Sequence, residues 1–130
     1  EDQEPAITAA CLYELNTCLL KLSEKARSRA VLEELSALYE RSNLPRQALY
    51  AEAKLKLGSI YEESCLFRKA MDCYQSALDA RQTVFGSEHN LIAECLMRLA
   101  GCLRRLNDHR QAQELQRCAE EMLDDLKHRA

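Results

Sequence analysis

The chain has 130 residues, of which 47% are hydrophobic and 30% charged, and it carries a formal net charge of −3. This composition is typical of one folded globular domain and excludes an intrinsically disordered chain. The chain is slightly acidic, whereas nucleic-acid binding usually needs a strongly basic face, and no apolar run approaches the roughly 20 residues that span a bilayer. We therefore expect neither a nucleic acid nor a membrane as a partner.

Helical periodicity in the apolar residues favours an all-α fold of five or six antiparallel helices, and the small number of Gly and Pro residues argues against many strands. The first helix is expected over residues 6–22. Its apolar residues repeat at 4-3-4 spacing and predict its buried face: Cys11, Leu15, Cys18 and Leu22, with Leu12 and Leu19 broadening that face. A second helix is expected over residues 23–41, with Ser23 as a candidate N-cap. Nothing at Ser23 forces a break, so one long bent helix is the alternative.

Pro45 marks a firm boundary, because proline fits the first turn of a helix and disfavours helix at the preceding residue. One helix is expected from Pro45 to Ser64 and the next from about Leu66. Gly86 is the expected left-handed residue at the end of that helix. The inward faces of these two helices are predicted to carry Leu49, Ala53, Leu57 and Ile60, and then Phe67, Met71, Tyr74 and Leu78.

The last two helices have the most regular apolar pattern. Ser87 is a candidate cap for the fifth helix, and Asp108 with Gln111 has the spacing of a capping box at the start of the sixth. Their inward faces are predicted to carry Ile92, Leu96, Leu99, Leu103 and Leu106, and then Ala112, Leu115, Ala119, Met122 and Leu126. The opposite face of the sixth helix is charged, as expected for a helix at the surface.

When the sequence is aligned with itself so that Leu57 is paired with Leu99, five packing positions match without a gap. The aligned pairs are Leu57 with Leu99, Gly58 with Ala100, Tyr61 with Leu103, Ala70 with Ala112, and Ala77 with Ala119. Small residues at such positions let two helices approach closely, and the large residues fill the space between them. We therefore expect a single domain over residues 1–130, with irregular N-terminal helices over 6–44, one repeat over 45–86, and a second repeat with a terminal helix over 87–128.

This pattern resembles the tetratricopeptide repeat over about residues 51–126. The residues that carry the resemblance are Leu57, Gly58 and Tyr61, then Ala70 with Tyr74, then Ala77. The second repeat departs from the pattern, because Gln116 stands where the first has Tyr74. The 42-residue period and the turn over residues 85–89 resemble the kinesin-light-chain subtype, although Asn90 replaces the proline of that turn.

The resemblance implies a non-catalytic scaffold, within a larger adaptor, that binds a peptide or helix of a partner protein in a concave groove. Its alternative is a structural helical bundle that mediates self-association. By position in the repeat, the groove would present Glu52, Leu55, Ser59 and Glu62 from one repeat and Glu94, Met97, Gly101 and Arg104 from the other. Ser59 and Gly101 occupy the place of the asparagine that grips a peptide carboxylate in chaperone-binding members, so that clamp is not predicted.

Basic residues cluster near the start of the last helix. The cluster consists of Arg104, Arg105, His109, Arg110 and Arg117. Such a cluster is either a site for an acidic peptide, since guanidinium groups bind carboxylates through paired hydrogen bonds, or an ordinary solvated helix face. We include Arg104 and Arg105 among the candidate partner-binding residues.

Seven cysteines without a CxxC motif are expected to be small buried hydrophobic residues in a reducing compartment, which predicts a cytoplasmic or nuclear protein. No local spacing of cysteine and histidine indicates a zinc site, and we expect no cofactor. The motifs of serine hydrolases, phosphate-binding loops and zinc proteases are also missing, so we predict that the chain is not an enzyme. A cysteine–histidine pair formed on folding is the catalytic alternative that the sequence leaves open.

Overall fold

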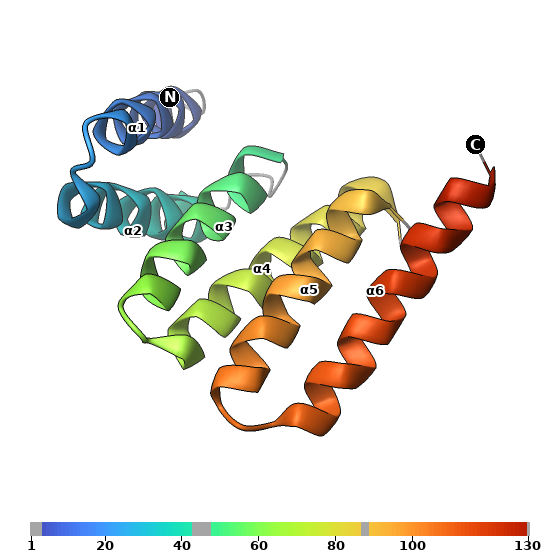
Figure 1. Ribbon diagram of the computed structural model, residues 1–130. Coiled ribbons are helices and arrows are strands. Elements are labelled where there is room, and N and C mark those ends of the chain that lie inside the picture. Colours follow the sequence, from blue (N-terminus) through green and yellow to red (C-terminus); the bar gives the residue numbers. More distant parts are fainter. Residues whose placement is uncertain (1–3, 43–47, 87–88, 130) are drawn as a thin grey trace.

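The computed structural model describes residues 4–42, 48–86 and 89–129, and within these ranges the chain forms six α-helices and no strand. They are α1 (Glu4–Lys21), α2 (Lys25–Ser42), α3 (Ala48–Glu63), α4 (Phe67–Phe85), α5 (Asn90–Arg105) and α6 (His109–Arg129). Each helix packs against its neighbours in the chain, so that the array runs from α1 at one edge to α6 at the other (Figure 1). The predicted all-α fold of antiparallel helix pairs is therefore confirmed.

The N-terminal half contains two helices, and the break lies at Ser23. Ser23 has a φ of 61°, in the left-handed region, and it follows α1 instead of capping α2 as the sequence suggested. Its N–H donates to the carbonyl of Leu20 at 3.1 Å, and the N–H of Glu24 donates to the carbonyl of Leu19 at 2.9 Å. These two bonds are the Schellman motif, which satisfies carbonyls at a helix end.

The same turn recurs at Cys65 and again at Asn107, at the interval that separates Leu57 from Leu99. Cys65 has a φ of 62° and Asn107 a φ of 65°. The N–H groups of Leu66 and Asp108 donate to the carbonyls of Tyr61 and Leu103, at 2.8 Å in both turns. The bounds of the helices follow the same interval, because α1, α3 and α5 end at Lys21, Glu63 and Arg105, while α2, α4 and α6 begin at Lys25, Phe67 and His109.

We infer from this spacing that α1 and α2 form the first of three similar helix pairs, where the sequence suggested irregular helices. The two small residues of the pattern, Gly58 and Ala70, correspond to Asn16 and Ser28 in the first pair. Both Asn16 and Ser28 are fully buried, and the Ser28 hydroxyl donates to Oδ1 of Asn16. The Asn16 amide nitrogen has no hydrogen-bond partner among the described residues. A buried polar pair thus replaces the contact between two small residues, and a search for that small-residue pattern misses it.

The buried face of α1 was predicted correctly only for Leu12 and Leu19. Its buried residues are Ala9, Asn16 and Leu19, with Leu12 partly buried beside them. The residues at 4-3-4 spacing that the sequence favoured are exposed: Cys11, Leu15, Cys18 and Leu22. Apolar residues line both sides of α1, so periodicity alone does not tell which side faces α2. Cys65 and Cys118 are also exposed, and only Cys73, Cys95 and Cys102 are the buried hydrophobic residues expected.

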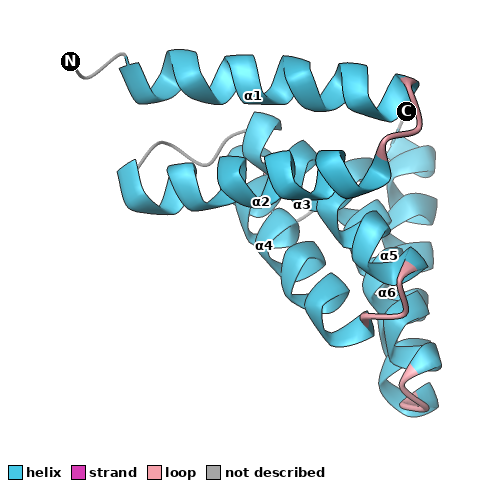
Figure 2. Cartoon of the chain, turned by 90° about the vertical axis from the view of Figure 1, so that its left-hand side faces the viewer, coloured by secondary structure: helices cyan, strands magenta, loops and turns pink. Residues whose placement is uncertain are grey.

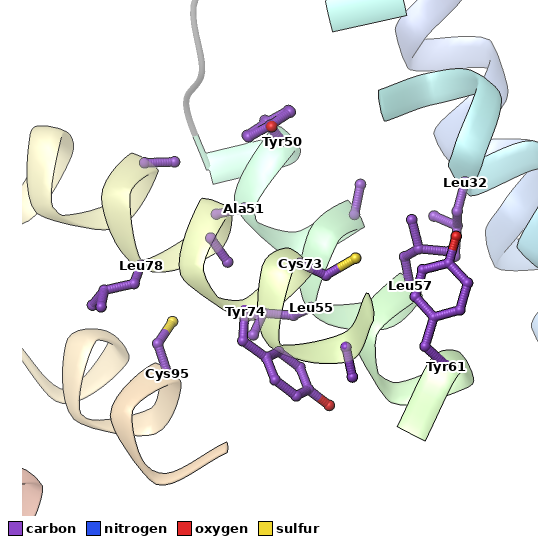
Figure 3. Close-up of a cluster of buried hydrophobic side chains, with 14 of the residues drawn as sticks. Leu32, Tyr50, Ala51, Leu55, Leu57, Tyr61, Cys73, Tyr74, Leu78 and Cys95 are labelled. Atoms are coloured by element: carbon purple, nitrogen blue, oxygen red, sulfur yellow. The ribbon is translucent and has the colours of Figure 1, made fainter. Parts of the chain in front are cut away.

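The predicted inward faces of the last four helices are confirmed, since every residue assigned to them is buried or partly buried. Figure 3 shows the centre of this core, where Tyr74 of α4 lies among residues of α3, including Leu55. Tyr74 is fully buried, and a Cβ added to Gly58 would lie 2.6 Å from its ring. Gly58 therefore allows α3 and α4 to approach around this ring.

The helix ends agree in part with the sequence signals. Gly86 has a φ of 80°, and its N–H donates to the carbonyl of Gln82 at 2.9 Å, as expected for a residue at a helix end. Asp108 accepts a bond from the Gln111 N–H at 3.3 Å, which is half of the predicted capping box. Pro45 and Ser87 lie outside the described residues. The cap observed at α5 is His89, whose Nδ1 accepts from the N–H of Leu91 at 3.1 Å.

Candidate functional site

A hollow with a volume of about 340 Å³ lies where the first helices of the three pairs, α1, α3 and α5, come together. We call it the central hollow. Apolar side chains and charged side chains both line it, and its apolar part gives a partner a surface from which water can be excluded. The apolar residues are Leu20, Leu55, Ile60 and Leu91, and the polar ones are Glu52, Lys56, Ser59, Glu63, Arg81, Glu94 and Arg98.

Polar contacts between α1 and α3 fix one side of the central hollow. The Tyr13 hydroxyl donates to Oε2 of Glu52 at 2.8 Å. The Lys56 ammonium donates to the same hydroxyl at 3.0 Å and lies 4.5 Å from the centroid of the Tyr13 ring. The tyrosine thus holds a carboxylate and an ammonium group in fixed places, and both of these side chains line the hollow.

Contacts between α3 and α5 fix the other side. The Arg98 guanidinium donates to the Ser59 hydroxyl at 3.3 Å and lies 5.8 Å from the centroid of the Tyr74 ring. Its Nε is 3.9 Å from the Glu94 carboxylate, and the two side chains are 41% and 45% exposed, so this ion pair adds little stability. A guanidinium has five N–H donors, more than these contacts use, so Arg98 can bind a further carboxylate.

Arg81 of α4 also lines the central hollow, and its side chain is only 5% exposed. Its Nη1 donates to the carbonyl of Leu91 at 3.0 Å and to Oε1 of Glu94 at 3.3 Å. A buried guanidinium must have partners, because desolvation penalises an unpaired charge. Arg81 therefore ties α4 to the first turns of α5, and it positions the Glu94 carboxylate that Arg98 also approaches.

The structure brings four of the predicted groove residues into the central hollow: Glu52, Leu55, Ser59 and Glu94. Glu62 is partly buried outside it and accepts a hydrogen bond from the Tyr74 hydroxyl at 2.7 Å. Met97 is 42% exposed, and Gly101 faces open space, since a Cβ there would meet nothing within 4 Å. Neither Met97 nor Gly101 lines the central hollow.

Arg104 and Arg105 contribute to two different surfaces. Arg104 lines a second hollow of about 770 Å³ along α6, whose other lining residues are all polar or charged. Two exposed ion pairs lie along this helix, Arg110 with Glu114 and Arg117 with Glu121, each at 3.9 Å. Arg105 lies 5.5 Å from the centroid of the Phe67 ring, on the side of the α3–α4 turn. The hollow along α6 therefore brings together four of the five residues of the predicted basic cluster, and only Arg105 lies apart: Arg104, His109, Arg110 and Arg117.

Several residues of the central hollow were missed by reasoning from the sequence: Leu20, Lys56, Glu63, Arg81, Leu91 and Arg98. A signal for two of them was present, since Lys56 and Arg98 occupy the same place in successive repeats. Each follows a glutamate by one helical turn, so the pairs Glu52–Lys56 and Glu94–Arg98 repeat one charge pattern on the first helix of each unit. Arg81 had a positional signal, because it lies three residues after Leu78 and continues the spacing of the predicted inward face of α4, but its charge argued against burial.

The buried thiols are poorly suited to nucleophilic chemistry. Burial raises the pKa of Cys73 to about 11, and burial together with the Glu62 carboxylate raises the pKa of Cys102 to about 12. Burial also raises the pKa of Cys95, although Arg81 opposes the shift. Thiolates are the reactive form, so these three side chains favour the unreactive thiol. Within the described ranges, no group of histidine, cysteine and carboxylate side chains is arranged to hold a metal ion.

We predict that four thiols react rapidly when the native protein is labelled as a dilute monomer, those of Cys11, Cys18, Cys65 and Cys118. The three buried thiols should react only when the protein opens, because access and a raised pKa both disfavour them. Timed maleimide labelling at mildly alkaline pH, followed by mass spectrometry of peptides, measures each thiol separately. Fast labelling of Cys73, Cys95 or Cys102 in the folded protein would contradict the arrangement of the core, and labelling in denaturant provides the control for all seven.

Comparisons with known proteins agree with this geometry. The family model described as "Tetratricopeptide repeat" matches residues 49–125. The chain is similar in structure to BtubC (BKLC) from P. vanneervenii, with a TM-score of 0.77 and 16% identity over 92% of this chain and 48% of that one. It is also similar to the TPR domain of Arabidopsis FLU, with a TM-score of 0.75 and 15% identity over 93% of this chain and 98% of that one.

The chain thus spans about half the length of BtubC, and both likenesses extend beyond residues 49–125. A comparison of the sequence with curated proteins finds no match. None of the described helices is both long and apolar enough to cross a bilayer. The family match covers more than half of the chain, and the predicted repeat spacing is present in the structure. The chain therefore belongs to the tetratricopeptide repeat family.

Proposed function

We propose that this chain binds a helix or an extended segment of a partner protein in the central hollow, as a non-catalytic module of a larger adaptor. Repeats of this family are generally protein–protein interaction modules. The observation that carries the proposal is the combination of an apolar surface at Leu20, Leu55 and Leu91 with fixed charges around it. Residues that dominate binding energy usually fill desolvated apolar pockets, and the entirely polar hollow along α6 offers none.

The charges of the central hollow indicate what the partner segment presents. Arg98 and Glu94 lie on the α5 side, and Glu52 and Lys56 lie on the α3 side. An apolar side chain of the partner would occupy the space between them. An acidic residue beside it would meet Arg98, which is partly exposed and has N–H donors that its own contacts leave unused.

The exposed thiols of the free cysteines support a reducing compartment, cytoplasmic or nuclear, for this interaction.

The test uses a phage-displayed library of random peptides, long enough for about four helical turns, selected on the immobilised chain. We expect the selected peptides to bind Arg98→Glu at least about ten-fold more weakly, because the substitution places a second carboxylate beside Glu94 and opposite the ligand's acid. The matched control is Arg104→Glu, a charge reversal on the same helix at a position outside the central hollow. Fluorescence anisotropy with labelled peptides measures both affinities.

The two variants separate the surfaces. Loss of binding in Arg98→Glu alone supports the central hollow. Loss in Arg104→Glu alone would transfer binding to the hollow along α6 and contradict the proposal. Thermal melts of both variants must match the wild type, since both side chains are exposed by more than a third and contribute little to stability.

A further inference from the structure

The outer face of α1, which we define by Ile7, Cys11, Leu15, Cys18 and Leu22, is an apolar surface that no described helix covers. Leu22 belongs to this face although it lies in the turn directly after α1. Ile7 is 60% exposed, Leu15 47% and Leu22 72%, and both cysteines between them are exposed. Figure 2 shows α1 along the edge of the array, where one of its sides faces away from the other helices.

A helix with two apolar faces is expected to be covered on both, since exposed apolar surface of this kind marks an interface. The inner face of α1 packs against α2. Tyr13 and Leu20 lie beside the central hollow, so a molecule bound to the outer face would leave that hollow open. The outer face can thus serve a purpose separate from the proposed partner site.

Four of the five outer-face residues have a spacing, 4-7-4, that is the same in both chain directions: Ile7, Cys11, Cys18 and Leu22. A two-fold axis placed between residues 14 and 15 brings Ile7 of one helix level with Leu22 of the other, and Cys11 level with Cys18. Leu15 then lies near the axis, beside Leu15 of the other copy. Apolar residues separated by three and four positions are those with which two helices interlock their side chains.

The charges at the ends of α1 select the antiparallel direction. Glu4 is in the first turn and Lys21 in the last turn. An antiparallel pair brings Lys21 of one copy within about one helical turn of Glu4 of the other and opposes the two helix dipoles. A parallel pair would place like charges together at both ends.

We propose that the outer face of α1 binds the same face of a second copy, with the two α1 helices antiparallel. This self-association does not depend on the proposed partner site, and it gives a concrete form to the alternative that the sequence left open. The pairing would leave the central hollows of both copies open to a partner.

The first experiment measures the molar mass by sedimentation equilibrium in reducing buffer. We expect the wild type to form a dimer and Leu15→Glu to be a monomer, because the new carboxylates of the two copies would lie side by side near the axis and lose water there. Val84→Glu is the matched control, since Val84 is exposed to a similar extent, 48%, on α4. A wild type that stays monomeric up to millimolar concentration overturns the proposal, and so does a dimer that persists in Leu15→Glu.

The second experiment tests the direction and register of the pair with a short bismaleimide cross-linker, in a background with Cys65→Ser and Cys118→Ser. Cys11→Ser and Cys18→Ser are prepared separately, so that each protein keeps one thiol on α1. We expect a covalent dimer only when the two are mixed, because the antiparallel register places Cys11 level with Cys18. Cross-linking of equal yield in either protein alone overturns this register.

Discussion

Replacing Ala112 with leucine is expected to lower the free energy of unfolding by about 1–3 kcal/mol, because the site is already filled. Ala112 is fully buried and packs with Ala100 and Leu103 between α5 and α6. A leucine there must push its neighbours or adopt an unfavourable rotamer. Ala70 occupies the equivalent position between α3 and α4 and is also fully buried, so Ala70→Leu should cost a similar amount.

Urea unfolding followed by circular dichroism measures both effects. Gln111→Leu is the control, because Gln111 precedes Ala112 and is exposed, and such substitutions usually change stability by less than about 0.5 kcal/mol. If both buried variants unfold at the wild-type urea concentration, the alignment of the two repeats is wrong as a description of packing.

The second and third helix pairs could be predicted from sequence because their packing positions follow a spacing that the chain repeats. Gly58, Ala70 and Ala77 have direct counterparts in the next repeat, and each counterpart is small. The first pair was not recognised as part of the same series, because Asn16 and Ser28 are polar and satisfy the close approach with a hydrogen bond. A sequence pattern classifies residues by size and polarity, and it does not reveal that two polar side chains form a hydrogen bond with each other.

The candidate site was predicted less well than the fold, for a geometric reason. The sequence of one repeat predicts which face of each of its helices is buried. The residues that meet in a hollow depend in addition on how neighbouring helix pairs are rotated against one another. Leu55 and Ser59 face the central hollow, whereas their counterparts in the next repeat, Met97 and Gly101, do not. On α5 the hollow is lined by the predicted Glu94 together with Leu91 and Arg98, and the buried Arg81 of α4 completes it.

Gly58 and Gly101 are expected to respond to alanine with opposite signs. Both lie in helix interiors, where alanine is intrinsically favoured over glycine by about 1 kcal/mol. At Gly101 nothing lies within 4 Å of the new Cβ, so Gly101→Ala should raise the free energy of unfolding by about 0.5–1 kcal/mol.

At Gly58 the new Cβ would lie 2.6 Å from Cε1 and 3.0 Å from Cζ of Tyr74. That ring cannot move aside freely, because it is fully buried and its hydroxyl donates to Glu62 at 2.7 Å. Overpacking of this kind costs about 1–3 kcal/mol, which exceeds the gain in helix propensity, so Gly58→Ala should destabilise the fold. Urea unfolding of both variants measures the two signs, and an increase in stability for Gly58→Ala would show that α3 and α4 do not approach as closely as this ring contact requires.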